Sequence, residues 1–80
     1  MATNRLLLRE GGITVRDRHA LGGRELQASF PTDRYSTDYI ASVVYRFVPA
    51  GWKQDSSRPW NVQNGTYTLP IKKRERGIGR

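Results

Sequence analysis

The chain has 80 residues, contains no cysteine and has a single histidine, His19. Without thiols it cannot form a disulfide framework or a thiolate zinc site, and one imidazole cannot build a histidine metal cluster. We therefore expect no resident metal and a reducing compartment, the cytoplasm.

Long apolar runs are missing as well. The longest aliphatic run is Leu6–Leu8, far short of a signal-peptide core or of the roughly 20 apolar residues that span a bilayer. Only 36% of the residues are hydrophobic, and a chain of this length buries about two-thirds of its unfolded surface. We expect one small domain with no membrane segment and no export signal.

Candidate catalytic groups are few. Asp17 stands near His19, but no serine lies in a nucleophile context. The glycine pairs Gly11–Gly12 and Gly22–Gly23 lack the spacing of a phosphate-binding loop, so they are typical of turns. We expect no enzymatic activity and no cofactor.

Charge is the most biased property of the sequence. Fourteen Lys and Arg face seven Asp and Glu, which gives a net charge of +7. Guanidinium groups, which predominate among these bases, bind either carboxylate or phosphate in bidentate fashion, so composition alone does not choose between an acidic protein and a nucleic acid. The charge concentrates at the end, and we expect a domain over 1–71 followed by a flexible basic tail over 72–80. The tail residues expected to contact a nucleic acid or an acidic surface are Lys72, Lys73, Arg74 and Arg76.

The first third of the chain predicts extended structure. Residues 5–9 and 13–16 flank a glycine turn and form either two strands or one strand with a break. Residues 25–30 alternate polar with apolar side chains, which predicts a strand that Pro31 closes.

The segment 36–48 fits two periods. Its apolar residues recur at helical spacing, and they also alternate at period two with strand-favouring types. Terminal signals favour the helix: Ser36 can cap it, Asp38 suits its positive end, and Pro49 stops it. We predict a helix over 37–48.

The remaining chain predicts one edge strand and one hairpin. Residues 52–62 can be extended, and Pro59 places them at an edge because it cannot donate to a neighbouring strand. Asn64–Gly65 is a strong hairpin signal before a short strand over 66–69. The expected fold is α+β: an antiparallel sheet of three to four strands with one packed amphipathic helix, in the order strand-strand-helix-strand.

The segment from Phe47 to Pro59 carries a distinctive pattern. Phe-Val-Pro-Ala-Gly-Trp ends the predicted helix at 47–52, and Arg58–Pro59 follow six residues after Trp52. This resembles the small inhibitors of host RNA polymerase encoded by T-seven-like podoviruses, the gene-product-two family. In that family the helix ends aromatic-Val-Pro-Ala-Gly-aromatic, and the next strand carries alternating arginines ending in Arg-Pro. The family's strand-strand-helix-strand order agrees with the order expected above.

The resemblance implies a stoichiometric inhibitor that docks on the jaw of the polymerase β′ subunit, beside the downstream DNA channel. There it would block promoter opening with help from the acidic N-terminal region of the sigma factor. Arg58 matches the family's partner-contacting arginine, the other strand arginine falls at Ser56, and Lys53 is the base that can replace its charge. The chain departs from the family in its acidic surface strip, because the helix here carries only Asp38.

Residue type supports a binding role for the same segment. Trp52, Trp60 and Arg58 belong to the types enriched at interface hot spots, although a tryptophan after a helix more often covers a core and an arginine is most often solvated. We expect a monomer in the host cytoplasm. Two other classes fit the sequence: a small basic nucleic-acid-binding protein, whose affinity would fall steeply with salt, and another phage inhibitor of host defence such as an anti-CRISPR protein.

Overall fold

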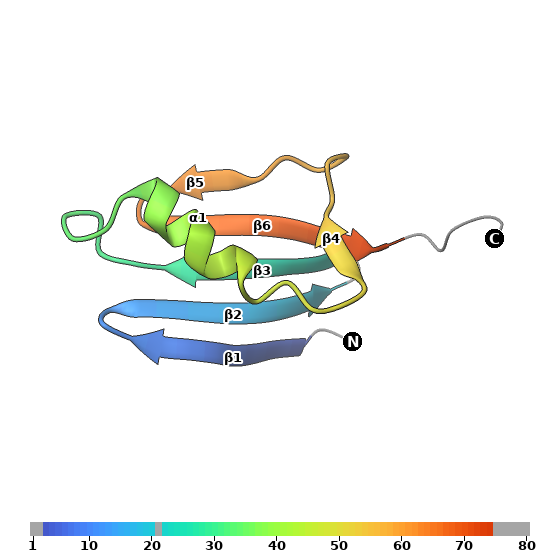
Figure 1. Cartoon of the computed structure of the whole chain (residues 1–80), viewed down its shortest axis with the longest axis horizontal. Helices are drawn as coiled ribbons and strands as arrows, with labels where there is room; N and C mark the ends of the chain where they lie inside the picture. Colours follow the sequence, from blue (N-terminus) through green and yellow to red (C-terminus); the bar gives the residue numbers. More distant parts are fainter. Residues whose placement is uncertain (1–2, 21, 75–80) are drawn as a thin grey trace, which may run out of the picture.

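The computed structural model describes residues 3–20 and 22–74. Six strands and one helix follow one another along this part of the chain (Figure 1). Their bounds are β1 (Thr3–Glu10), β2 (Ile13–Ala20), β3 (Gly23–Ser29), α1 (Thr37–Tyr45), β4 (Trp52–Gln54), β5 (Asn61–Gln63) and β6 (Thr66–Lys73).

The strands form one antiparallel sheet in the order β1-β2-β3-β6-β4, and β5 also pairs with β6. The predicted sheet of three to four strands in the order strand-strand-helix-strand is therefore wrong. The observed chain order is three strands, the helix and three more strands, and the fold is mostly β.

Two causes explain the additional strands. β2 continues from Val15 through the polar residues Arg16–His19, which lack the apolar alternation of a half-buried strand, and it stays paired with both β1 and β3. The predicted edge strand over 52–62 is interrupted by a turn at Asp55–Arg58, where the backbone N–H of Arg58 donates to the carbonyl of Asp55 at 3.1 Å. That turn leaves two short strands in place of one.

The helix begins where the sequence predicts. The Ser36 side chain accepts a hydrogen bond from the backbone N–H of Tyr39 at 3.1 Å, and Asp38 lies in the first turn. The helix ends at Tyr45, three residues before the predicted end at Val48. Beyond it the N–H groups of Phe47 and Val48 bond to carbonyls three residues back, and this tighter turn leads into Pro49.

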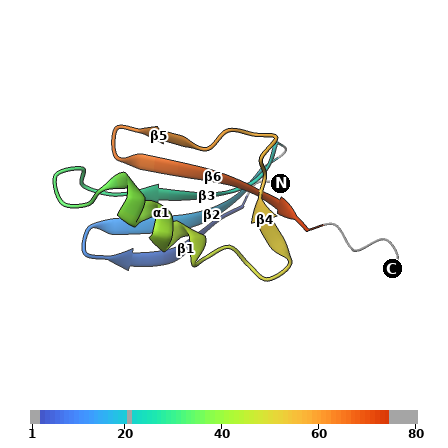
Figure 2. The ribbon, with the colours of Figure 1, turned by 45° about the horizontal axis from the view of Figure 1, so that its top comes forward.

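The helix packs on one face of the sheet, over β3 and β6 (Figures 1 and 2). The core between these two layers consists of Ile13, Val15, Leu26, Ala28, Phe30, Ile40, Val43, Val44, Tyr67, Leu69 and Ile71. No described element covers the opposite face, which we call the open face. Strand alternation and register place five bases and one carboxylate there: Arg9, Arg16, Arg18, Lys53, Lys72 and Glu25.

The last strand is longer than the predicted 66–69. It passes Pro70 and ends at Lys73, so the expected tail boundary at 72 falls inside β6. The carbonyl of Pro70 accepts from the Asp55 N–H at 2.9 Å, which shows that this residue points its backbone away from β3. On that side, β6 pairs with β5 up to Thr68 and with β4 from Ile71 onward. Pro70 lies between these two paired segments, so its lack of an N–H group costs no hydrogen bond between strands.

Candidate partner-binding surface

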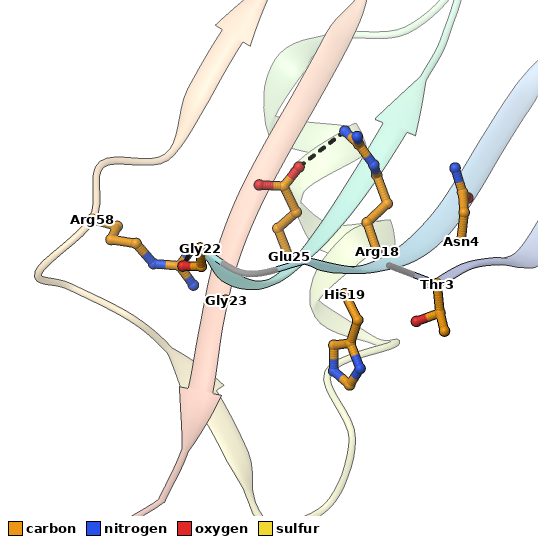
Figure 3. Close-up of a pocket in the computed structure, with 8 residues that line it drawn as sticks. All are labelled: Thr3, Asn4, Arg18, His19, Gly22, Gly23, Glu25 and Arg58. Atoms are coloured by element: carbon orange, nitrogen blue, oxygen red, sulfur yellow. Dashed lines mark hydrogen bonds and ion pairs between the residues drawn. The ribbon is translucent and has the colours of Figure 1, made fainter. Parts of the chain in front are cut away.

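Arg58 ties three separate segments together. Its Nε donates to Asp55 Oδ2 at 3.0 Å and its Nη1 to the Gly22 carbonyl at 3.2 Å. Its Nη2 donates to the carbonyls of Arg24 at 2.9 Å and Ile71 at 3.2 Å. The guanidinium therefore joins the 55–58 turn to the β2–β3 hairpin and to β6 (Figure 3).

The turn that carries Arg58 is held by a carboxylate. Asp55 is buried, and its Oδ1 accepts from both the backbone N–H and the hydroxyl of Ser57, at 3.0 and 2.6 Å. The bonds from Ser57, followed by those from Arg58, lower the pKa of the Asp55 carboxyl to about 2. Both carboxylate oxygens of Asp55 thus accept hydrogen bonds, and these bonds hold the first residues of the loop from 55 to 60 in place.

Gly23 gives the Arg58 side chain its space. A Cβ on this residue would lie 3.0 Å from Arg58 Nη1 and 3.1 Å from Cζ, and the glycine φ is +124°. A side chain here would meet the guanidinium and strain the backbone at once.

The resemblance implies that Arg58 contacts the partner. In the structure, however, the N–H groups of its guanidinium donate to acceptors within this chain. Its bonds reach partners 36, 34 and 13 positions away, and no local sequence signal identifies such acceptors. Through these bonds Arg58 positions the loop that leads to Trp60.

Trp52 is half-buried and packs against the core. The Arg24 guanidinium lies 4.3 Å from the centre of its ring, and the His19 ring lies 6.2 Å away. Arg24 also forms a two-bond ion pair with Asp17, and these bonds lower the pKa of the Asp17 carboxyl. Trp52 is therefore mainly a packing residue, an alternative that its position after a helix already favoured.

Trp60 and Tyr45 form an exposed aromatic patch. Trp60 is 53% exposed and stacks on the buried Tyr67 with ring centres 6.0 Å apart, while Tyr45 is 45% exposed. The Tyr45 hydroxyl donates to Gln54 Oε1 at 2.6 Å. Burial, followed by the nearby Tyr45, raises the pKa of Tyr67. The two exposed rings thus flank Tyr67 on the helix side of the sheet, and we call Tyr45 and Trp60 the aromatic patch.

Sequence reasoning included Trp60 as a candidate and missed Tyr45. On the helix, Tyr45 follows the buried Val44 and lies off the apolar row. A large aromatic on the solvated side of an amphipathic helix is the signal that could have identified it.

The other predicted contact residues are distributed over the molecule. Ser56 is exposed in the 55–58 turn, close in sequence to the aromatic patch, whereas Lys53 lies on the open face. The candidate tail residues divide as well: Lys72 and Lys73 belong to β6, and Arg74 donates its backbone N–H to Gly51. Arg76 lies outside the described residues.

A pocket of about 380 Å³ opens at the end of β2 and β3, lined by Thr3, Asn4, Arg18, His19, Gly22, Gly23, Glu25 and Arg58 (Figure 3). Its two guanidiniums already have partners, because Arg18 pairs with Glu25 at 3.1 Å and Arg58 bonds to carbonyls. Figure 3 shows His19 pointing away from the Arg18–Glu25 pair. The pocket therefore does not gather several charges toward one ligand.

Comparisons with known proteins do not extend this picture. No family model matches the chain, and no curated protein or solved structure matches it either. Among residues 3–20 and 22–74, no three His, Asp or Glu side chains gather as metal ligands. In the same ranges no helix has the length and apolar character to cross a membrane.

Proposed function

We propose that this chain is a non-catalytic inhibitor that binds bacterial RNA polymerase and blocks promoter opening. The observation that carries the proposal is the aromatic patch, since it adjoins the segment in which the resemblance lies. Helix α1, the turn after it and the loop braced by Arg58 present Tyr45 and Trp60 to solvent on one side of the molecule. Exposed aromatics on a rigid base are the side chains that most often dominate a protein interface.

The identity of the partner is inferred from the resemblance alone. The proposed binding site is the jaw of the β′ subunit, near the downstream DNA channel, and the acidic N-terminal region of the sigma factor is a second proposed contact. The site of action is then the host cytoplasm, and a monomer suffices. Ser56 lies in the same loop as Trp60 and belongs to the proposed contact region, whereas Lys53 lies on the open face.

The test replaces Trp60, because a change at Arg58 would disturb the fold itself. Loss of a hot-spot side chain costs about 2 kcal/mol or more, so Trp60→Ala should weaken capture of purified polymerase about 30-fold and relieve inhibition of promoter opening to the same degree. The matched control is Tyr39→Ala. Tyr39 is 47% exposed on α1 and, like Trp60, it stacks on one tyrosine, with its ring centre 5.5 Å from that of Tyr35.

The first measurement is capture of the polymerase from a bacterial lysate after nuclease treatment, followed by promoter-opening assays with both variants. Equal inhibition by wild type and Trp60→Ala would remove the aromatic patch from the contact. Failure of the wild type to bind polymerase at all would refute the proposed target.

A further inference from the structure

The open face carries a charge arrangement that folding alone does not explain. Lys53 on β4 and Lys72 on β6 are direct partners across the sheet. Like charges directly opposite on neighbouring strands destabilise a sheet. In the described part of the chain the ion pairs are Arg18–Glu25, Arg24–Asp17 and Arg58–Asp55, and none of them neutralises either lysine.

The rest of the open face has the same sign. Arg16 lies on β2 two residues from Arg18, about 7 Å along the strand, and Arg9 lies on β1. Among residues 3–20 and 22–74, Glu25 is the only carboxylate that alternation and register place on this face, and it pairs with Arg18. The other strand carboxylates, Glu10 and Asp17, lie on the helix side, where Asp17 pairs with Arg24. The open face therefore carries a clear excess of bases over carboxylates.

The neutral residues of the open face indicate the chemistry of its partner. They are hydroxyl and amide side chains such as Thr14, Gln27 and Thr68, which lie in rows across the sheet. Leu6 is the one exposed large apolar side chain among them, and the exposed aromatics Tyr45 and Trp60 lie on the helix side. Protein interfaces depend on aromatic and apolar anchors, whereas a phosphate backbone is held by cations, hydroxyls and amides.

We infer that the open face binds the phosphate backbone of duplex DNA without reading its sequence, with Lys53, Lys72, Arg16 and Arg9 as the principal contacts. A phosphate placed between Lys53 and Lys72 removes their repulsion, and the hydroxyl and amide groups of the face donate to neighbouring phosphates. Alternation and register place no aromatic side chain of the described strands on this face, so these strands offer none of the stacking surface on which single-stranded nucleic acids bind. The choice of DNA among polyanions rests on the proposed function, which puts the molecule beside a DNA channel.

The test measures binding of the full chain to a fluorescein-labelled 20-base-pair duplex by anisotropy, with no polymerase present. Four phosphate contacts give a slope of log affinity against log salt near −3.6, so affinity should fall about 150-fold between 50 and 200 mM salt. The double variant Lys53→Gln/Lys72→Gln should bind at least tenfold more weakly at 100 mM salt, with a slope reduced by about 2.

The matched control is Arg34→Gln/Arg46→Gln, which removes the same charge from exposed positions outside the strands. This variant should lose less than threefold in affinity. A thermal melt without DNA supplies a second readout, because removing the Lys53–Lys72 repulsion should raise the melting temperature. Added duplex should raise the melting temperature of the wild type more than that of the lysine variant.

Three results would overturn the inference. Equal losses in the two double variants would mean that net charge, not the open face, binds DNA. Competition by polyglutamate as effective as competition by duplex DNA at equal charge would assign the face to an acidic protein. No binding by the wild type at 50 mM salt would exclude DNA altogether, and it would leave the polymerase proposal and its Trp60 test unaffected.

Discussion

Replacing Arg58 by methionine should destabilise the domain strongly. Methionine keeps the unbranched apolar stem of the side chain and removes all four hydrogen bonds, three of which go to backbone carbonyls. A hydrogen bond from a charged group is worth about 1.5–3 kcal/mol, and because the Arg58 side chain is 31% exposed we use the lower end. Loss of the three carbonyl bonds, at about 1.5 kcal/mol each, then costs about 4.5 kcal/mol of unfolding free energy.

A change of this size is easy to measure in a small domain. For 60–100 residues each kcal/mol lowers the melting temperature by about 4–8 °C, so Arg58→Met should melt more than 10 °C below the wild type. Urea unfolding should show a lower midpoint with an unchanged slope. Arg58→Lys restores the charge without the planar fork, and should recover less than half of the loss.

The control is Arg46→Met, which alters an exposed arginine at the end of the helix and should change the unfolding free energy by less than about 0.5 kcal/mol. A loss below about 1 kcal/mol in Arg58→Met would contradict a stabilising role for these hydrogen bonds. The guanidinium would then be a solvated group whose bonds contribute little, and its role as a partner contact would regain support.

Two further predictions concern Gly23 and the carboxylates Asp17 and Asp55. Gly23→Ala should destabilise the domain, because its Cβ meets the Arg58 guanidinium at 3.0 Å; in the Arg58→Met background the same change should cost measurably less, and equal costs would show that the two residues do not interact. Acid should also weaken the fold. The folded-state pKa values of Asp17 and Asp55 lie below the ordinary aspartate value of 3.8, and that of Asp55 is about 2. Their stabilisation is therefore fully present above pH 4 to 5 and is lost as the pH falls through 3.8 toward 2. At constant salt, the urea midpoint should stay constant down to about pH 5 and decrease at lower pH. A midpoint unchanged at pH 2.5 would show that these two carboxylates do not stabilise the fold.

The parts of the fold that local chemistry determines were predicted from sequence. Ser36 caps the helix, and the Asn64–Gly65 turn joins β5 to β6 with φ values of 50° and 77°. Both are encoded within a few residues, so no distant contact is needed to recognise them.

The missing strands depend on information that lies elsewhere in the chain. The polar end of β2 is a strand only because β1 and β3 pair with it on both sides. The hydrogen bonds of Arg58 likewise depend on carbonyl groups of the β2–β3 hairpin and of β6, which the sequence around Arg58 does not reveal. For the candidate site, sequence identified Trp60 but not its neighbour Tyr45, since the exposure of both depends on how α1 and β5 lie against Tyr67.

The position of β6 has a consequence for how the molecule assembles. This strand lies between β3 on one side and β4 and β5 on the other, yet it is the last of the six along the chain. Until it is in place, the β1–β2–β3 meander exposes the apolar row that includes Leu26 and Ala28, and α1 has only one of its two supporting strands. Pairings such as Arg24 with Ile71 join distant positions, which makes folding slow. Until β6 pairs with β3, the edge of β3 in a newly made chain can therefore pair with other chains and aggregate. A chaperone that shields this edge would raise the yield of folded protein.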